Sequence, residues 1–350
     1  PYIWKELGTQ CRNLPQVHTS VRMMRMISEV VCPRVLLLGE VVMEPEKVAP
    51  YFGTVEKPEC HMLYNVTTMA TIWNTVATKD IRLLRRQMDI VYTLPKEYTF
   101  LNYLRCHDDI GWGLDYAALK EWGMEEIPHK RFLNDYFTGR MAGSVSRGEL
   151  YNDDPVTCDA RFCGTTASMC GIESAEFEQD DDKLDDAISL DIMLHAYILC
   201  QSGIPMLYSG DEIGQVNDYS YKDDPDKAAD SRYIHRGKFP WELEQKRSDA
   251  TSMQGRVFRG LRTLEEIRRA EKVFESAADV YTYDVHNESV LCIMRKTEEE
   301  TFFGIFNFSG QDETAWMNES GMFEDLLTGE EIVLDNVTVP RHSFYWLRSR

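Results

Sequence analysis

The pattern of apolar and polar positions predicts an alternation of helices and short buried strands over most of the chain. Apolar side chains recur every three or four positions in four segments, which indicates helices with one buried face. These segments are 16–31, 69–89, 182–200 and 254–272. Three short runs that are apolar on both faces favour buried strands of a parallel sheet. These runs are 35–38, 99–104 and 204–208.

The pattern changes near Phe274, where strand-like runs such as 290–294 and 302–306 are separated by polar turns. We expect residues 274–350 to form a small antiparallel, β-sandwich-like domain. The mixed stretch 110–180 is too long for a plain loop, so it is expected to form a subdomain. Strands alternating with helices, followed by a β-rich tail, indicate an α/β protein that contains part of a (β/α) barrel.

Composition excludes several classes of function. The chain has 350 residues, 43% of them hydrophobic, and a formal net charge of -20. This acidity argues against nucleic-acid partners and against docking on anionic membranes. No apolar stretch reaches the ~20 residues of a membrane helix. The nine cysteines include no Cys-x-x-Cys pair, which argues against a zinc site or a disulfide framework and suggests reduced thiols and a cytoplasmic location.

Acidic side chains follow each of the three predicted strands, and a histidine also follows the second. Side chains at the carboxyl ends of parallel strands converge on one rim, where barrel enzymes place their active sites. Neighbouring carboxylates raise one another's pKa, so one of them can remain protonated and act as a general acid in glycosidic cleavage. The residues at these strand ends are Glu40, His107, Asp108, Asp109, Asp211 and Glu212.

Each of these features also has a simpler interpretation. Glu40 can be a solvated residue at the end of a strand. The triplet 107–109 can form a turn, a helix N-cap at Asp109, or, less readily, a metal site. A metal site is disfavoured because adjacent side chains on a strand point to opposite faces. The glycines around Asp211 and Glu212 can form no more than a tight turn.

Three motifs in this order resemble the α-amylase superfamily, glycoside hydrolase family 13. Glu40 stands where that family has its acid/base glutamate after the fifth barrel strand. The segment Phe100–Asp108 resembles the region after the seventh strand, and Gly203–Gly214 resembles the eighth-strand signature. By this resemblance, Asp108 is the transition-state stabiliser, and His107 binds sugar hydroxyls.

Finer matches point to the amylosucrases within that superfamily. They lie in the segments Ile3–Lys5, Gly8–Thr9, Asn13–His18, His107–Trp112, Asp159–Thr165 and Asp230–Arg236. The resemblance implies that Arg232 pairs with an acid beside the glucose subsite and that Arg161 lies on the acceptor side. Asp109 is grouped with them as a substrate-binding residue.

The resemblance implies that residues 1–273 are the C-terminal half of a (β/α)8 TIM barrel, strands 5–8, with 110–180 inserted after strand 7. The nucleophilic aspartate of the family would then lie three residues before Pro1. We therefore expect a fragment of a longer enzyme that is inactive alone and lacks about half of its barrel strands.

The implied parent enzyme is a retaining glycoside hydrolase or transglucosidase that acts on sucrose or α-glucan without a cofactor or metal. Glu40 protonates the leaving oxygen and then deprotonates the acceptor, which is α-glucan or water. The alternatives are a sucrose hydrolase, a sucrose phosphorylase, an α-amylase, or a non-catalytic carbohydrate-binding barrel. The acceptor and the oligomeric state stay open.

Overall fold

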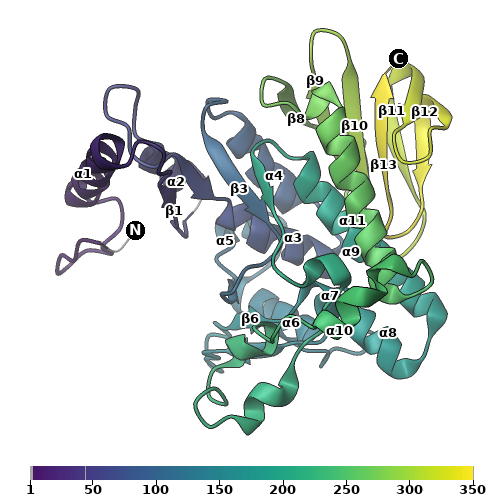
Figure 1. The fold of residues 1–350 in the computed structure, drawn as a ribbon, viewed down its shortest axis with the longest axis horizontal. Coiled ribbons are helices and arrows are strands. Elements are labelled where there is room, and N and C mark those ends of the chain that lie inside the picture. Colours follow the sequence, from purple (N-terminus) through teal and green to yellow (C-terminus); the bar gives the residue numbers. More distant parts are fainter. Residues whose placement is uncertain (1–2, 44, 350) are drawn as a thin grey trace.

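The computed structural model describes residues 3–43 and 45–349. Residue Pro1, on which the expectation about an upstream aspartate rests, lies outside these residues. The amino-terminal elements lie at one end, and a broad antiparallel sheet covers the other end (Figure 1). Long helices lie between a small parallel sheet and this antiparallel sheet. The described part of the chain contains no helix that is long and apolar enough to cross a membrane.

The parallel sheet has four strands in the order β1-β2-β3-β7. Each neighbouring pair is parallel, so the carboxyl ends of all four strands meet at one edge. The strands are β1 (Leu38–Gly39), β2 (Met62–Tyr64), β3 (Thr99–Tyr103) and β7 (Ile204–Met206). Three of them overlap the apolar runs, whereas β2 was missed because polar His61 and Asn65 flank its three residues.

Burial in this sheet depends on strand position rather than on sequence pattern. Leu101 and Tyr103 in the inner strand β3 are buried. In contrast, Leu38 in β1 is 37% exposed and Ile204 in β7 is 43% exposed. The expectation that the run 35–38 is buried on both faces is therefore wrong, because β1 is an edge strand that no further described strand covers.

The long helices follow the apolar periodicity closely. Pro15 opens α1, and Asp180 caps α9 by accepting a hydrogen bond from the backbone N–H of Lys183. The single helix expected over 69–89 is instead two helices, because Lys79 takes a left-handed conformation that ends the first. The helices are α1 (Pro15–Val31), α3 (Val66–Thr78), α4 (Arg82–Tyr92), α9 (Asp181–Cys200) and α11 (Met253–Ala270).

The stretch after β3 contains a three-stranded antiparallel sheet in the order β4-β6-β5 and several short helices. Its elements are β4 (Ile110–Gly111), α5 (Tyr116–Glu121), α6 (Glu126–Phe137), β5 (Glu149–Tyr151), β6 (Arg161–Cys163), α7 (Thr166–Cys170) and α8 (Ile172–Glu178). The short elements elsewhere are α2 (Pro45–Val48), η1 (Ala49–Phe52), η2 (Asp211–Ile213), η3 (Tyr219–Asp223), η4 (Ser231–His235), α10 (Trp241–Glu244), η5 (Gln245–Ser248) and η6 (Lys272–Phe274).

The carboxyl-terminal part is one antiparallel sheet of six strands in the order β12-β11-β13-β10-β9-β8. Alternate side chains of β10 belong to two different cores. Phe302 and Phe306 pack with the helices, whereas Phe303 and Ile305 pack with β11 and β12. The strands are β8 (Asp279–Tyr283), β9 (Val290–Lys296), β10 (Thr301–Asn307), β11 (Glu313–Asp325), β12 (Glu331–Val339) and β13 (Phe344–Ser349).

Candidate active site

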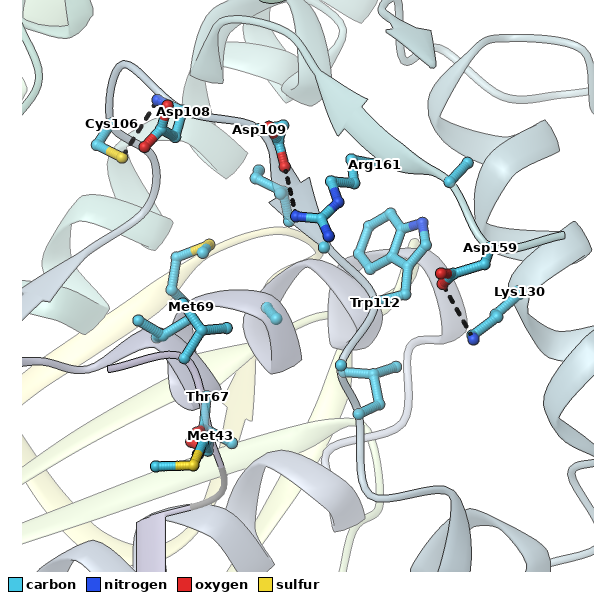
Figure 2. Close-up of a pocket in the computed structure, with 18 of the residues that line it drawn as sticks. Met43, Thr67, Met69, Cys106, Asp108, Asp109, Trp112, Lys130, Asp159 and Arg161 are labelled. Atoms are coloured by element: carbon cyan, nitrogen blue, oxygen red, sulfur yellow. Dashed lines mark hydrogen bonds and ion pairs between the residues drawn. The ribbon is translucent and has the colours of Figure 1, made fainter. Parts of the chain in front are cut away.

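A cavity of about 580 Å³ opens at the carboxyl edge of the parallel sheet (Figure 2). Of the six residues to which the resemblance assigns a catalytic or substrate-binding role, five line it: Glu40 after β1, Asp108 and Asp109 after β3, Arg161 in β6, and Arg232 in η4. These residues are distant in sequence and meet because parallel strands end on one side of a sheet. Tyr103, Trp112 and Lys130 line the same cavity.

Glu40 is exposed and follows Gly39 directly. The strand passes so close to β2 that a Cβ at Gly39 would lie 2.5 Å from Leu63 Cδ2. Burial raises the pKa of Tyr103 well above its usual value, and the nearby charges of Glu40 and Asp108 raise it further. Both carboxylates also raise the pKa of the Cys106 thiol, although burial is again the main cause. The two carboxylates therefore act on the same small region of the cavity.

Asp108 is surrounded by cationic side chains. Its Oδ1 lies 3.2 Å from Arg236 Nη2 and 3.7 Å from Arg232 Nη1. His107 Nε2 lies 3.4 Å from Asp108 Oδ2. The two adjacent side chains thus reach each other, and the opposite-face expectation is wrong here because the chain bends after β3 ends at Tyr103.

His107 is the one of these six residues that does not line the cavity. Its side chain is 64% exposed at the rim, where it contacts Asp108. Its carbonyl oxygen points inward and accepts hydrogen bonds from Arg236 Nε at 2.6 Å and from His235 Nε2 at 3.2 Å. The backbone of His107 is therefore held more firmly than its imidazole.

Arginine side chains and carboxylates alternate around the remaining wall. Arg161 Nη1 donates to Asp109 Oδ2 at 3.3 Å (Figure 2). Asp109 is not a helix cap, because strand β4 and no helix follows it. Lys130 Nζ binds Asp159 Oδ1 at 3.1 Å. Arg232 holds both oxygens of Asp230, and that bidentate contact raises the pKa of the guanidinium. Such groups are suited to donate and accept hydrogen bonds with the hydroxyls of a sugar.

The third strand end contributes a buried ion pair rather than a cavity residue. Asp211 accepts from Arg105 Nε at 2.8 Å and lies 2.7 Å from its Nη2, and both side chains are 2% exposed. Glu212 accepts a hydrogen bond from the backbone N–H of Gly210. The interpretation of this segment as a tight turn therefore fits, since Gly210 has a φ of 98°.

Sequence reasoning missed several residues of this site, including Arg236, His235, Lys130 and Trp112. One signal was available for Arg236, because it stands four positions after Arg232 in the segment Asp230–Arg236. The same signal was available for His235, whereas Lys130 and Trp112 come from the stretch after β3, where no periodicity indicates which side chains face inward. No group of three or more His, Cys, Asp or Glu side chains in the described chain is arranged to hold a metal ion.

No family model matches the chain. The glucosylglycerate phosphorylase of Spirochaeta thermophila is 27% identical to it over 307 residues, which cover 86% of this chain and 47% of that protein. The glucosylglycerate phosphorylase of Escherichia coli K12 is 22% identical over 352 residues, 99% of this chain and 58% of that protein. These relatives of the chain are enzymes of the α-amylase superfamily. The chain spans about half the length of these curated relatives.

The trehalose synthase of Thermus thermophilus is 32% identical over 215 residues, 61% of this chain and 18% of that enzyme. Solved structures share the fold. Sucrose 6F-phosphate phosphorylase from Thermoanaerobacter thermosaccharolyticum superposes with a TM-score of 0.63 at 19% identity, over 95% of this chain and 58% of that chain. AmyP in complex with maltose superposes with a TM-score of 0.62 at 13% identity, over 95% of this chain and 61% of that chain. The α/β fold with a carboxyl-terminal antiparallel sheet is thus one that amylase-like proteins have.

Proposed function

We propose that this chain carries the acid/base and stabilising residues of a retaining enzyme that transfers glucosyl units from an α-glucoside. One observation carries the proposal: Glu40 and Asp108 line the same cavity at the carboxyl edge of a parallel sheet. In this proposal Glu40 protonates the leaving oxygen and then activates the acceptor. Asp108 stabilises the oxocarbenium-like charge, and His107, Asp109, Arg161 and Arg232 bind the sugars.

The surroundings of the two carboxylates support different roles. Glu40 is exposed at the cavity and has no ion pair within 4 Å among the described residues, so it is free to exchange a proton with a substrate. Asp108 has two guanidinium groups and an imidazole within 4 Å, which fix its position and complement its negative charge. A fixed carboxylate suits the stabilisation of positive charge, whereas a solvent-accessible one suits proton transfer.

The proposal also assigns the nucleophile and the remaining barrel strands to a part of the enzyme that this chain does not contain. The four parallel strands would be strands 5–8 of a (β/α)8 barrel, with residues 110–180 inserted after strand 7 and 274–350 as a separate domain. Two observations support this: the relatives are about twice as long, and the outer strands are exposed. A retaining reaction needs a second carboxyl ~5–5.5 Å from the acid/base, and we assign that group to the half that completes the barrel.

The motifs favour amylosucrase-like chemistry, in which glucosyl units pass from sucrose to α-glucan or water. Phosphorolysis is the second candidate, because both glucosylglycerate phosphorylases match most of this chain and the cavity wall carries Lys130, Arg161 and Arg232. Sucrose hydrolysis, α-amylase activity and non-catalytic sugar binding are the remaining alternatives. The cytoplasmic location that the cysteines suggest stays a prediction.

A product assay separates these reactions. The longer polypeptide that contains this chain would be incubated with sucrose or glucosylglycerate, with and without inorganic phosphate and with and without glycogen. Insoluble glucan indicates polymerisation, free glucose indicates hydrolysis, and glucose 1-phosphate that forms only with phosphate indicates phosphorolysis. Asp108→Asn should reduce every one of these products. If Asp108→Asn turns over at the wild-type rate, the proposed site is wrong.

A further inference from the structure

Two consecutive side chains hold the peptide carbonyl that precedes Asp108. His235 ends the η4 turn, and Arg236 follows it. Arg236 Nε donates to the His107 carbonyl oxygen at 2.6 Å, and His235 Nε2 lies 3.2 Å from the same oxygen. These two hydrogen bonds connect the η4 segment, which follows β7, to the chain just after β3.

The imidazole of His235 has only one tautomer that satisfies its contacts. Its Nδ1 lies 3.1 Å from the backbone nitrogen of Gly164, which has a proton to donate. The Nδ1 atom must therefore accept and be unprotonated, so the single proton of a neutral imidazole is on Nε2. The Nε2–H group then donates to the carbonyl of His107.

This imidazole is also kept neutral. His235 is 5% exposed, and burial lowers its pKa to about 3. The nearby cations Arg105 and Arg236 lower the pKa further, while the carbonyl of His107 and the carboxylate of Asp230 oppose that shift. A histidine that stays neutral does not add charge beside Asp108 as the pH changes. It serves as a fixed donor.

Arg236 reaches a second point of the same segment. Its Nη2 donates to Asp108 Oδ1 at 3.2 Å while its Nε holds the preceding carbonyl. One planar guanidinium thus fixes both the peptide before Asp108 and the carboxylate itself. A lysine has one nitrogen at the end of a flexible stem and cannot hold both points in the same geometry.

We propose that His235 and Arg236 are positioning residues that set the orientation of Asp108 by clamping the carbonyl oxygen of His107. The inference rests on the proposed role of Asp108 and adds two residues that act through it. A misplacement of about 1 Å can cost about 100-fold in rate, so the loss of either contact should lower kcat more than it changes KM.

Matched substitutions of His235 test the clamp in the enzyme that contains this chain. His235→Asn can keep the acceptor for Gly164 but is too short to reach the carbonyl of His107, whereas His235→Gln can place an amide N–H near the Nε2 position. We expect His235→Asn to lower kcat by about 10- to 100-fold with KM changed by less than about threefold, and His235→Gln to recover most of that loss. Arg236→Lys should resemble His235→Asn. The exposed His286 provides the control His286→Asn, which should leave kcat unchanged.

The outcomes separate the two proposals. An inactive wild-type enzyme overturns the proposed function and, with it, the clamp. An active wild-type enzyme whose His235→Asn variant keeps full kcat overturns the clamp alone. If kcat falls equally for His235→Asn and His235→Gln, and the melting temperature of each variant falls with it, then His235 has only a structural role. That result also overturns the clamp. Nitrogen-15 NMR of the imidazole should show an Nε2–H tautomer that does not titrate down to about pH 5, and an Nδ1–H tautomer would refute the clamp.

Discussion

Removing either partner of the ion pair between Arg105 and Asp211 should destabilise the protein far more than removing a surface ion pair. Both side chains are 2% exposed, and two guanidinium nitrogens approach one carboxylate oxygen at 2.7 and 2.8 Å. The Arg105 guanidinium also lies 4.6 Å from the ring of Tyr208. Loss of one partner leaves the other charge buried and unpaired, which costs about 3–5 kcal/mol.

The two single variants should not be equivalent, because Asp191 lies near the pair. Its carboxylate is fully buried, and neither oxygen has a hydrogen-bond partner among the described residues. In Arg105→Met, the buried carboxylates of Asp211 and Asp191 would both lose the Arg105 guanidinium, while the His195 imidazole would remain 3.6 Å from Asp191 Oδ2. In Asp211→Leu, the charge of Arg105 would still be partly balanced by Asp191. We therefore expect Arg105→Met to be the more destabilising variant, and the double variant to lie closer to wild type than the sum of the singles.

Urea unfolding of the purified chain measures these differences. With a slope of about 3 kcal/mol per M, a loss of 3–5 kcal/mol shifts the midpoint by about 1 M or more. The control is Glu266→Gln, which removes the exposed pair between Arg262 and Glu266 and should cost about 0.3–0.5 kcal/mol. If Arg105→Met and Glu266→Gln shift the midpoint equally, the buried pair contributes no more to stability than a surface pair, and the reasoning is wrong.

Three further predictions follow from the site and its surroundings. Glu40→Gln in the longer enzyme should abolish transfer from sucrose but be partly rescued with α-glucosyl fluoride, whose leaving group needs no acid, while activation of the acceptor by Glu40 stays lost; unchanged sucrose turnover would exclude Glu40 as the acid. Burial raises the pKa of Asp191 to about 7, so the folded state binds one proton more than the unfolded state between about pH 4 and 7, and stability should fall as the pH rises through that window. Asp191→Asn should flatten this dependence in urea titrations at several pH values, and an unaltered slope would contradict the assignment. The face of α1 that carries Met26 and Val30, which are 63% and 83% exposed, should bind an apolar dye and promote self-association of the chain. The double substitution Met26→Glu and Val30→Glu should reduce dye fluorescence and the self-association that light scattering measures. A wild-type chain that stays monomeric and binds no dye would contradict this prediction.

Local sequence patterns determined where the long helices lie. In α1 the period brings Val17 and Val21 to the buried face, and in α9 the aspartate at its start caps the free N–H groups. These features depend on residues three or four positions apart, so the sequence alone reveals them. The strand-end placement of Glu40 and Asp108 was predictable for a similar reason, since a short apolar run precedes each acidic residue by no more than four positions.

The tertiary structure alone decided which polar residues meet. Asp108 and Asp211 both follow apolar strands, yet one carboxylate faces the cavity and the other is buried against Arg105. The direction that each side chain takes depends on the bend after its strand and on the cation that reaches it from another element. The hold of His235 and Arg236 on the His107 carbonyl joins segments 128 and 129 residues apart. The hydrophobic periodicity along the chain does not indicate such contacts, because they depend on how β3, β6 and η4 come together in space.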